Sequence, residues 1–238
     1  MTHTAAAAPP LPGQHPRPET PVLLNRQLRP GTQPSELSSF GDERWNLTPA
    51  IFEGHLQSVS LNFALVPAAF RETAKLYTWL ELNHENLLIL RRASINGRLA
   101  VYTMLSHTRN IRAFLDWLDL RGITSLGAVT DTDLERYLDH VREVEIRRGA
   151  RSDLLQAVRR LWAFRELLPA SGCLPEAPPW NGKDTRILLG RAQQRDRENR
   201  TPRIPEATMS MMLCWALRLI DHFSGDRKST RLNSSHER

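Results

Sequence analysis

Three stretches decide the fold: TRNIRAFLDWL at residues 108–118, TDTDLERYLDHV at residues 130–141 and SDLLQAVRRLWAF at residues 152–164. In each, apolar residues recur at the spacing of one face of an α-helix. Thr130 with Asp133 is typical of a capping box at the start of the second helix, and Ser152 is the predicted cap of the third. The predicted apolar stripes comprise Ile111, Phe114, Leu115 and Leu118, then Leu134, Tyr137, Leu138 and Val141, then Leu154, Leu155, Val158, Leu161 and Trp162. Because helices with one apolar face bury those faces against one another, we expect a small helical domain over residues 98–170 in a mainly α protein.

The composition is that of a soluble chain with one or two domains. It has 238 residues, 40% of them apolar, and a formal net charge of +6. Its two cysteines, Cys173 and Cys214, lie in no CxxC or Cys/His cluster, which argues against a disulfide framework and a structural zinc site. No apolar run is long enough to span a membrane, and the N-terminus lacks the pattern of a signal peptide. We therefore expect a cytoplasmic protein without metal or cofactor.

The segments on either side of the helical domain differ in composition. Residues 1–40 are rich in Ala and Pro and are predicted to be a disordered tail. Residues 41–97 are predicted to be mixed but mostly helical, with an extended piece over residues 59–66 and then one helix or two from Pro67. A weaker helical stretch over residues 86–92 precedes a turn at Asn96-Gly97.

The segment beyond residue 170 is predicted to be a linker and then a helix. The linker covers residues 171–203, contains several prolines and becomes dense in arginine. The helix covers residues 204–224 and would lead toward a further domain. Its predicted apolar face comprises Met209, Met212, Leu213, Ala216 and Ile220.

The last residues have an unusual sequence. Residues 226–236 read DRKSTRLNSSH, which is identical to a one-frame translation of a widely used sequencing adapter. We interpret residues 225–238 as an artefactual tail, so the natural protein would continue past about Ser224 and the chain would be a truncated fragment. The alternative is a genuine polar tail. Without residues 225–238, which carry four basic and two acidic residues, the net charge falls from +6 to +4 (6 − 2).

The order of these motifs resembles the N-terminal and core-binding part of the tyrosine recombinases, or phage-type integrases. In that family a first helix reads Phe-Leu-x-Trp-Leu, as at residues 114–118, and a glycine turn follows, as at Gly122. The next helix resembles Asp-Leu-x-x-Tyr-Leu, as at residues 133–138, and the third resembles residues 154–164. Residues 198–205 and 215–218 are similar to the segment that leads to the catalytic domain in long actinobacterial-type integrases.

The resemblance implies a SAM-like helical fold that binds double-stranded DNA, with further protomers assembling on the DNA. Strand transfer in this family uses a tyrosine nucleophile, two arginines and a His-x-x-Arg element. The chain has tyrosines only at Tyr77, Tyr102 and Tyr137, all within apolar helical patterns, and none of its histidines has arginine three residues later. We therefore predict a DNA-binding part without catalytic residues, associated with the nucleoid when DNA-bound.

Arginine is the residue type that would contact the DNA. The candidate DNA-binding residues are Arg109, Arg112, Arg147, Arg148, Arg151, Arg159 and Arg160. The guanidinium group has a planar fork of donors that suits phosphate oxygens. The alternative is a solvated face with ion pairs, such as one between Arg165 and Asp116. A rival function is a non-enzymatic helical module that binds a protein through residues 209–220.

Other notable side chains have ordinary structural interpretations. We expect Trp79, Trp117, Trp162 and Trp215 to pack in the core and not to stack on bases. We expect Met209, Met211 and Met212 to be core residues. The less favoured alternative is that they line a groove for a partner. His107 and His140 are expected at the surface or the core edge, without a metal.

Overall fold

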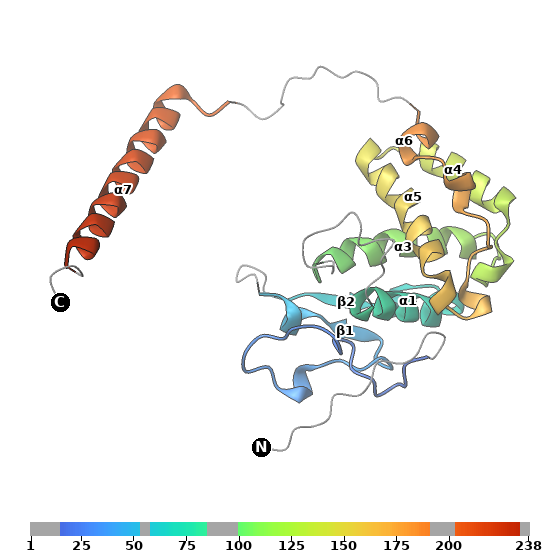
Figure 1. The fold of residues 1–238 in the computed structure, drawn as a ribbon. Coiled ribbons are helices and arrows are strands. Elements are labelled where there is room, and N and C mark those ends of the chain that lie inside the picture. The colour runs from blue at the N-terminus through green and yellow to red at the C-terminus, as the bar shows by residue number, and fades with distance from the viewer. Residues whose placement is uncertain (1–14, 53–57, 85–99, 191–202, 234–238) are drawn as a thin grey trace. The chain divides into compact units, whose positions relative to one another are not determined.

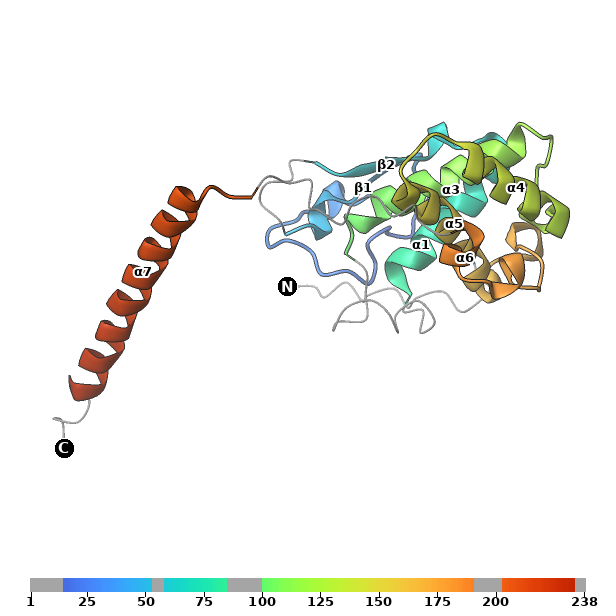
Figure 2. The ribbon, with the colours of Figure 1, turned by 90° about the horizontal axis from the view of Figure 1, so that it is seen from above.

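The computed structural model describes residues 15–52, 58–84, 100–190 and 203–233, with side chains as far as His222. The chain divides into two compact units, residues 1–192 and residues 193–238. The first unit contains the helices α1 (Arg71–Asn83), α3 (Thr103–Asp119), α4 (Asp131–Glu143), α5 (Arg148–Ala163) and α6 (Thr185–Leu188). Strands β1 (Arg44–Asn46) and β2 (Ser60–Asn62) pair antiparallel at the end of this unit opposite α4 and α6 (Figures 1 and 2). The predicted mainly helical fold is confirmed.

The three predicted stripes form the core of α3, α4 and α5. In α3 and α4 every predicted stripe residue is buried, and in α5 Leu155, Val158 and Leu161 are buried while Leu154 and Trp162 are partly buried. Three aromatic rings join α3 to α4, because Tyr137 meets Phe114 at 4.7 Å and Trp117 at 5.2 Å between ring centroids. Edge-to-face contacts of this kind favour one packing of the two helices.

The two predicted helix caps have different outcomes. Thr130 and Asp133 form the predicted capping box at the start of α4. The prediction of Ser152 as the cap of α5 is wrong, because the helix begins one turn earlier at Arg148 and Arg147 is its N-cap. The Arg151 side chain donates two hydrogen bonds to the carbonyl of Val144, at 3.1 and 2.8 Å. This contact with the segment just before α5 stabilises the first turn of the helix, and the local preference of Ser152 for a cap position is overridden.

Residues 1–40 were expected to be a disordered tail, but they are packed wherever the structure describes them. Residues 15–40 pack against α1, and Val22, Leu23 and Phe40 are buried. Asn83 at the end of α1 holds this segment, since its side chain donates to the carbonyl of Val22 at 2.8 Å and accepts from the amide of Asn25 at 2.9 Å. Isolated anchors of this kind have no helical or strand period, which is why composition alone suggested disorder. Residues 1–14 lie outside the described residues.

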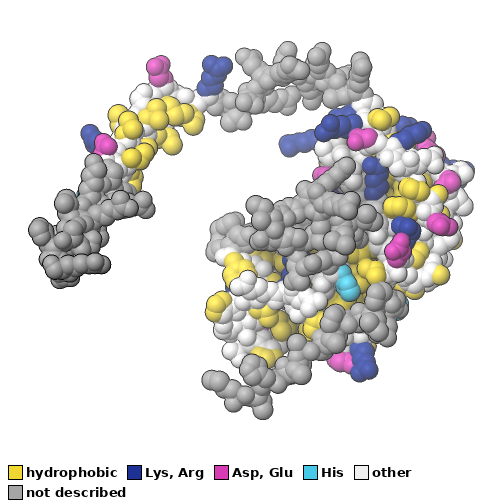
Figure 3. Space-filling model, in the orientation of Figure 1, with side chains coloured by type: hydrophobic (Ala, Val, Ile, Leu, Met, Phe, Trp, Pro, Cys, Tyr) yellow, Lys and Arg dark blue, Asp and Glu magenta, His cyan; other side chains and the backbone are white. Residues whose placement is uncertain are grey.

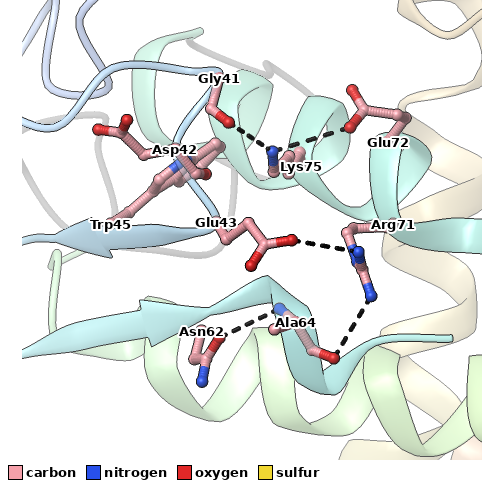
Figure 4. Close-up of polar contacts among 9 residues, drawn as sticks. All are labelled: Gly41, Asp42, Glu43, Trp45, Asn62, Ala64, Arg71, Glu72 and Lys75. Atoms are coloured by element: carbon pink, nitrogen blue, oxygen red, sulfur yellow. Dashed lines mark hydrogen bonds and ion pairs between the residues drawn. The ribbon is translucent and has the colours of Figure 1, made fainter. Parts of the chain in front are cut away.

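The two-strand sheet is attached to the start of α1. Trp45 and Leu61 point inward from β1 and β2, and Trp45 packs on Phe63 with 4.5 Å between ring centroids. Figure 4 shows the polar contacts of residues 41–43 with α1, where Arg71 lies 3.3 Å from the Glu43 carboxylate and Lys75 donates to the carbonyl of Gly41 at 3.1 Å. The extended piece predicted over residues 59–66 is therefore the short strand β2 with a helical turn after it. The helix predicted from Pro67 is present as a 3-10 turn and then α1, and the predicted stretch over residues 86–92 lies outside the described residues.

Residues 171–190 pack against the helices, although a linker was expected there. Leu174, Trp180 and Leu188 are buried. The indole of Trp180 donates to the carbonyl of Leu134 in α4 at 3.0 Å. Trp180 and Asn181 both adopt left-handed backbone conformations, with φ of 54° and 51°. A proline-rich loop that is anchored by a single tryptophan has no periodic pattern. For this reason residues 171–190 were wrongly included in the predicted linker.

The second unit contains one long helix, α7 (Glu206–Asn233). It covers the predicted helix over residues 204–224 and continues through residue 233, so the first part of the predicted artefactual tail is helical. Its large apolar side chains are exposed, with Trp215 61% and Met211 61% accessible. The expectation that Trp215 and the methionines are core residues is therefore wrong within the described residues. No helix in the described ranges combines the length and the apolar character needed to cross a bilayer.

Candidate nucleic-acid interface

The outer face of α3 presents two of the candidate arginines. Met104, Ile111 and Phe114 point inward, which turns Arg109 and Arg112 outward at i, i+3 spacing. Arg109 is exposed. Arg112 is half-buried and its Nε lies 3.3 Å from the Asp116 carboxylate, at i, i+4 spacing. Exposed pairs of this kind contribute little to stability, and the guanidinium keeps further donors for a polyanion.

The arginines at the start of α5 have different environments. Arg147 is exposed and has no side-chain hydrogen bond at the cap. Arg148, next to it, donates to the carbonyls of Leu189 at 2.9 Å and Arg186 at 3.3 Å, and also to that of Gly190. Arg148 and Arg151 therefore bind main-chain oxygens of this unit.

The face of α5 opposite its apolar stripe is covered and not solvated. Arg159 donates to the Thr185 hydroxyl at 3.1 Å and to the carbonyl of Lys183, and its guanidinium lies over the Trp180 ring at 5.7 Å from the centroid. Gln156, on the same face, donates to the Thr185 hydroxyl at 2.8 Å. The prediction that Arg159 lies opposite the apolar stripe is correct, but residues 183–188 cover that face of α5.

Two further arginines that the sequence did not single out also make specific contacts, Arg142 with residues 183–190 and Arg121 with Trp117. Arg142 in α4 donates from Nε and Nη2 to the carbonyl of Leu188, at 3.0 and 2.9 Å. We call Arg142, Arg148 and Arg159 the arginine clamp, because all three bind main-chain carbonyls of residues 183–190. Arg121, just after α3, lies 3.7 Å over the Trp117 ring. No sequence signal distinguishes an arginine that binds a distant carbonyl from one that faces solvent.

Basic side chains nevertheless gather on the surface around α5 and α6 (Figure 3). Lys183 and Arg186 are exposed there, on either side of the buried Thr185. The predicted pair of Arg165 with Asp116 is replaced by pairs of each with a nearer neighbour, since Arg165 lies 3.3 Å from Glu166 and Asp116 pairs with Arg112.

Arg160 belongs to a buried polar cluster between α1, α3 and α5. In this cluster the Glu81 carboxylate lies 2.6 Å from the His107 ring nitrogen Nδ1, and both side chains are almost fully buried. Burial and the nearby Glu81 carboxylate raise the pKa of Tyr77 well above its usual value, while the Arg160 charge acts in the opposite direction. The Nη1 atom of Arg160 is buried, which makes Arg160 a less accessible phosphate ligand than the exposed Arg109 and Arg147.

Two of the three tyrosines, Tyr77 and Tyr137, are poorly placed to act as nucleophiles. The side chains of Tyr77 and Tyr137 are buried, and burial raises the pKa of both hydroxyls. Tyr102 is half-exposed at the N-cap of α3. A phosphodiester cannot reach a hydroxyl inside the helical core, so Tyr77 and Tyr137 have the packing role predicted for Tyr137.

The histidines and acidic residues form no metal centre among the described residues, where no group of three potential ligands occurs. His107 is bonded to Glu81 in the core, which is deeper than the expected core edge. His140 is exposed beside the Trp117 ring, with 6.3 Å between centroids.

Comparison with known protein families bears on this helical unit. The model of the phage integrase N-terminal SAM-like domain matches residues 90–166. Residues 90–166 form an integrase SAM-like domain. Its described part contains α3, α4 and all of α5, so the arginines of α3 and of α5 lie within the SAM-like domain. Searches of curated proteins and of solved structures gave no significant match.

The match also separates the SAM-like domain from the segments that complete its packing. The arginine clamp runs from Arg142, Arg148 and Arg159 inside the matched range to residues 183–190 beyond its end. On the other side, the Glu81 carboxylate of α1 binds His107 of the domain. The folded unit therefore extends past both ends of the SAM-like domain.

Proposed function

We propose that this chain is the DNA-binding part of a site-specific tyrosine recombinase. The observation that carries the proposal is the SAM-like domain with Arg109 and Arg112 on the outer face of α3. Arg147 extends the cationic surface at the start of α5. Arginine contacts to phosphate position a protein on duplex DNA without reading its sequence.

We propose that a subset of the seven candidate arginines contacts DNA, and that Arg160, whose Nη1 is buried, is not part of it. Arg109, Arg112 and Arg147 are the proposed phosphate ligands, with the exposed Lys183 and Arg186 as additional contacts. Arg148, Arg151 and Arg159 are proposed to maintain the fold, since their donors bind carbonyls. The proposed partner is double-stranded DNA inside the cell, with further recombinase protomers on the same DNA. We assign no strand-transfer role to Tyr77 or Tyr137.

Binding of a fluorescent duplex to the full chain over a range of salt concentrations tests this function. We expect the logarithm of the affinity to fall linearly with the logarithm of salt concentration, because bound arginines release counterions. The triple variant Arg109→Ala/Arg112→Ala/Arg147→Ala should lower the slope by roughly one for each phosphate-binding arginine that is removed. The matched control is Arg17→Ala, an exposed arginine outside the SAM-like domain, which should bind as the native chain does. Salt-independent binding, or no binding by a folded chain, would refute the proposal.

A second candidate function rests on α7. Its exposed apolar residues between Met209 and Ile220 are a suitable surface for a protein partner, which would make the chain a helical interaction module. The same titration distinguishes the two functions. DNA affinity that is unchanged in the triple variant favours the interaction module, and a loss of affinity with retained helical circular dichroism favours the recombinase part.

A further inference from the structure

The N-terminal region contains a polar hollow far from the SAM-like match in sequence. It has a volume of about 710 Å³ and lies between the loop that carries Arg29 and the outward faces of β1 and β2. Among its lining residues Pro49 is the apolar one, while Arg29, Arg44 and several serine and threonine hydroxyls supply polar groups. Pockets for apolar small molecules are lined mainly by hydrophobic and aromatic side chains. This hollow therefore suits a small, highly polar ligand.

Strand alternation explains why these side chains share one face. Trp45 and Leu61 point into the core, so their neighbours Arg44 and Ser60 point out of the sheet. Arg44 Nε donates to the Ser60 hydroxyl at 3.1 Å, which orients the guanidinium along the rim. Arg29 approaches from the loop, and its Nε donates to the carbonyl of Ile51.

Both guanidinium groups are thus held through Nε. Within the described residues neither Arg29 nor Arg44 has a carboxylate close enough to form an ion pair. Glu36 is the one acidic lining residue, and it accepts a hydrogen bond from the amide of Gln33 at 3.2 Å in its own turn. The lining therefore carries two positive charges and one negative charge.

We propose that this hollow binds a phosphate group through Arg29 and Arg44. The terminal amino groups of an arginine fork match two phosphate oxygens, and such charge-assisted hydrogen bonds are the strong ones. The Ser58 hydroxyl, which also lines the hollow, can donate to a remaining oxygen. The phosphate is supplied either by a DNA backbone, a source that rests on the proposed function, or by a free phosphate compound.

Titration of the nitrogen-15-labelled full chain with inorganic phosphate, followed by NMR, tests the site. A titration with chloride at equal ionic strength is the reference. We expect phosphate-specific shifts of the amides of residues 44–46 and 58–60. The variant Arg44→Gln should weaken phosphate binding roughly tenfold, the effect of losing charge-assisted hydrogen bonds. Arg44→Lys, which keeps the charge but lacks the fork, should give an intermediate loss. The control Arg17→Gln, an exposed arginine that does not line the hollow, should bind phosphate as the native chain does.

Duplex binding by the same variants identifies the source of the phosphate. If the DNA backbone supplies it, Arg44→Gln lowers duplex affinity and reduces the salt slope by about one. If the source is a free phosphate, Arg44→Gln loses inorganic phosphate but binds the duplex normally. The triple variant of the SAM-like domain should retain phosphate binding in either case, so failure of the recombinase proposal is separable from failure of this site. Absence of phosphate-specific shifts, or an Arg44→Gln variant that binds phosphate normally, overturns the proposal.

Discussion

At the scale of single residues, neighbouring arginines have opposite roles. Arg147 and Arg148 are adjacent in sequence at the start of α5, yet one faces solvent and the other binds three carbonyls. The sequence predicts that both are cationic and near a helix start. It cannot predict which of them meets residues 186–190, because that contact depends on a distant loop whose path has no periodic pattern.

The substitution Arg148→Ala should lower the free energy of unfolding by about 1.5 kcal/mol, because three partly buried or exposed carbonyls lose a charged donor. Arg147→Ala is the matched control and should change it by less than about 0.5 kcal/mol. Urea denaturation followed by circular dichroism measures both. Equal effects of the two substitutions would contradict the assignment of Arg148 to the arginine clamp.

Asn181 is a second residue at which single substitutions test the structure, through its backbone conformation. Its φ of 51° lies in the left-handed region, which a side chain with Cβ disfavours and asparagine tolerates better than most residues. Asn181→Ala should therefore lower the free energy of unfolding by about 1 kcal/mol, while Asn181→Gly should not lower it. Thermal unfolding of both variants checks this, and a glycine variant as unstable as the alanine variant would count against the conformation.

At the scale of elements, sequence reasoning succeeded where an element buries one face and was wrong elsewhere. The stripes of α3 and α4 were predictable because their apolar residues repeat with the helical period. Residues 15–40 and 171–190 were mispredicted because a few separate anchors, such as Phe40 and Trp180, hold them. For the same reason the outward position of the α3 arginines was predictable, whereas Arg148 and Arg159, which were candidate DNA-binding residues, bind carbonyls of residues 183–190.

The capping box of α4 gives a pH dependence with a definite sign. Hydrogen bonds from the Thr130 hydroxyl and amide to the Asp133 carboxylate, at 2.6 and 3.0 Å, lower the pKa of Asp133 below its ordinary value of 3.8. A lowered pKa in the folded state adds stability above pH 3.8, and this stability is lost as the pH falls through the folded-state value.

Asp133→Asn should therefore destabilise the protein at neutral pH, and the difference from the native chain should shrink below pH 3.8. Thr130→Ala should cost about 1 kcal/mol at neutral pH, as for other N-cap losses. Urea denaturation at several pH values provides the measurement. A difference that grows on acidification would contradict the predicted direction.

At the scale of the whole molecule, the N-terminal region and the SAM-like domain share one core. Glu81 of α1 and His107 of α3 form a buried pair, and Tyr77 of α1 packs edge-on against Phe164, which follows α5, with 5.2 Å between centroids. Residues 15–84 are therefore part of the same packed unit as residues 100–190, and the second unit is described by α7 alone.

His107→Ala should lower the free energy of unfolding of the first unit by about 3 kcal/mol, because it leaves the Glu81 carboxylate buried without its partner. Unfolding followed by tryptophan fluorescence and by circular dichroism should shift together, since Trp45 and Trp79 lie in the N-terminal region and Trp117 lies in the SAM-like domain. The control His140→Ala, on an exposed side chain, should change little. Separate transitions would show that the two regions unfold independently.

The arginine clamp has a consequence for how sequences of this kind can diverge. Its guanidinium groups bind mainly main-chain carbonyls of residues 183–190, and every residue type supplies the same carbonyl. Substitutions in that segment should therefore be tolerated at exposed positions such as Ile187, while replacement of Arg142 or Arg148 should not be. We expect homologous chains to conserve the arginines while the sequence of the segment that they bind varies. Sequence conservation would then identify the hydrogen-bond donors but not the segment that supplies the acceptors.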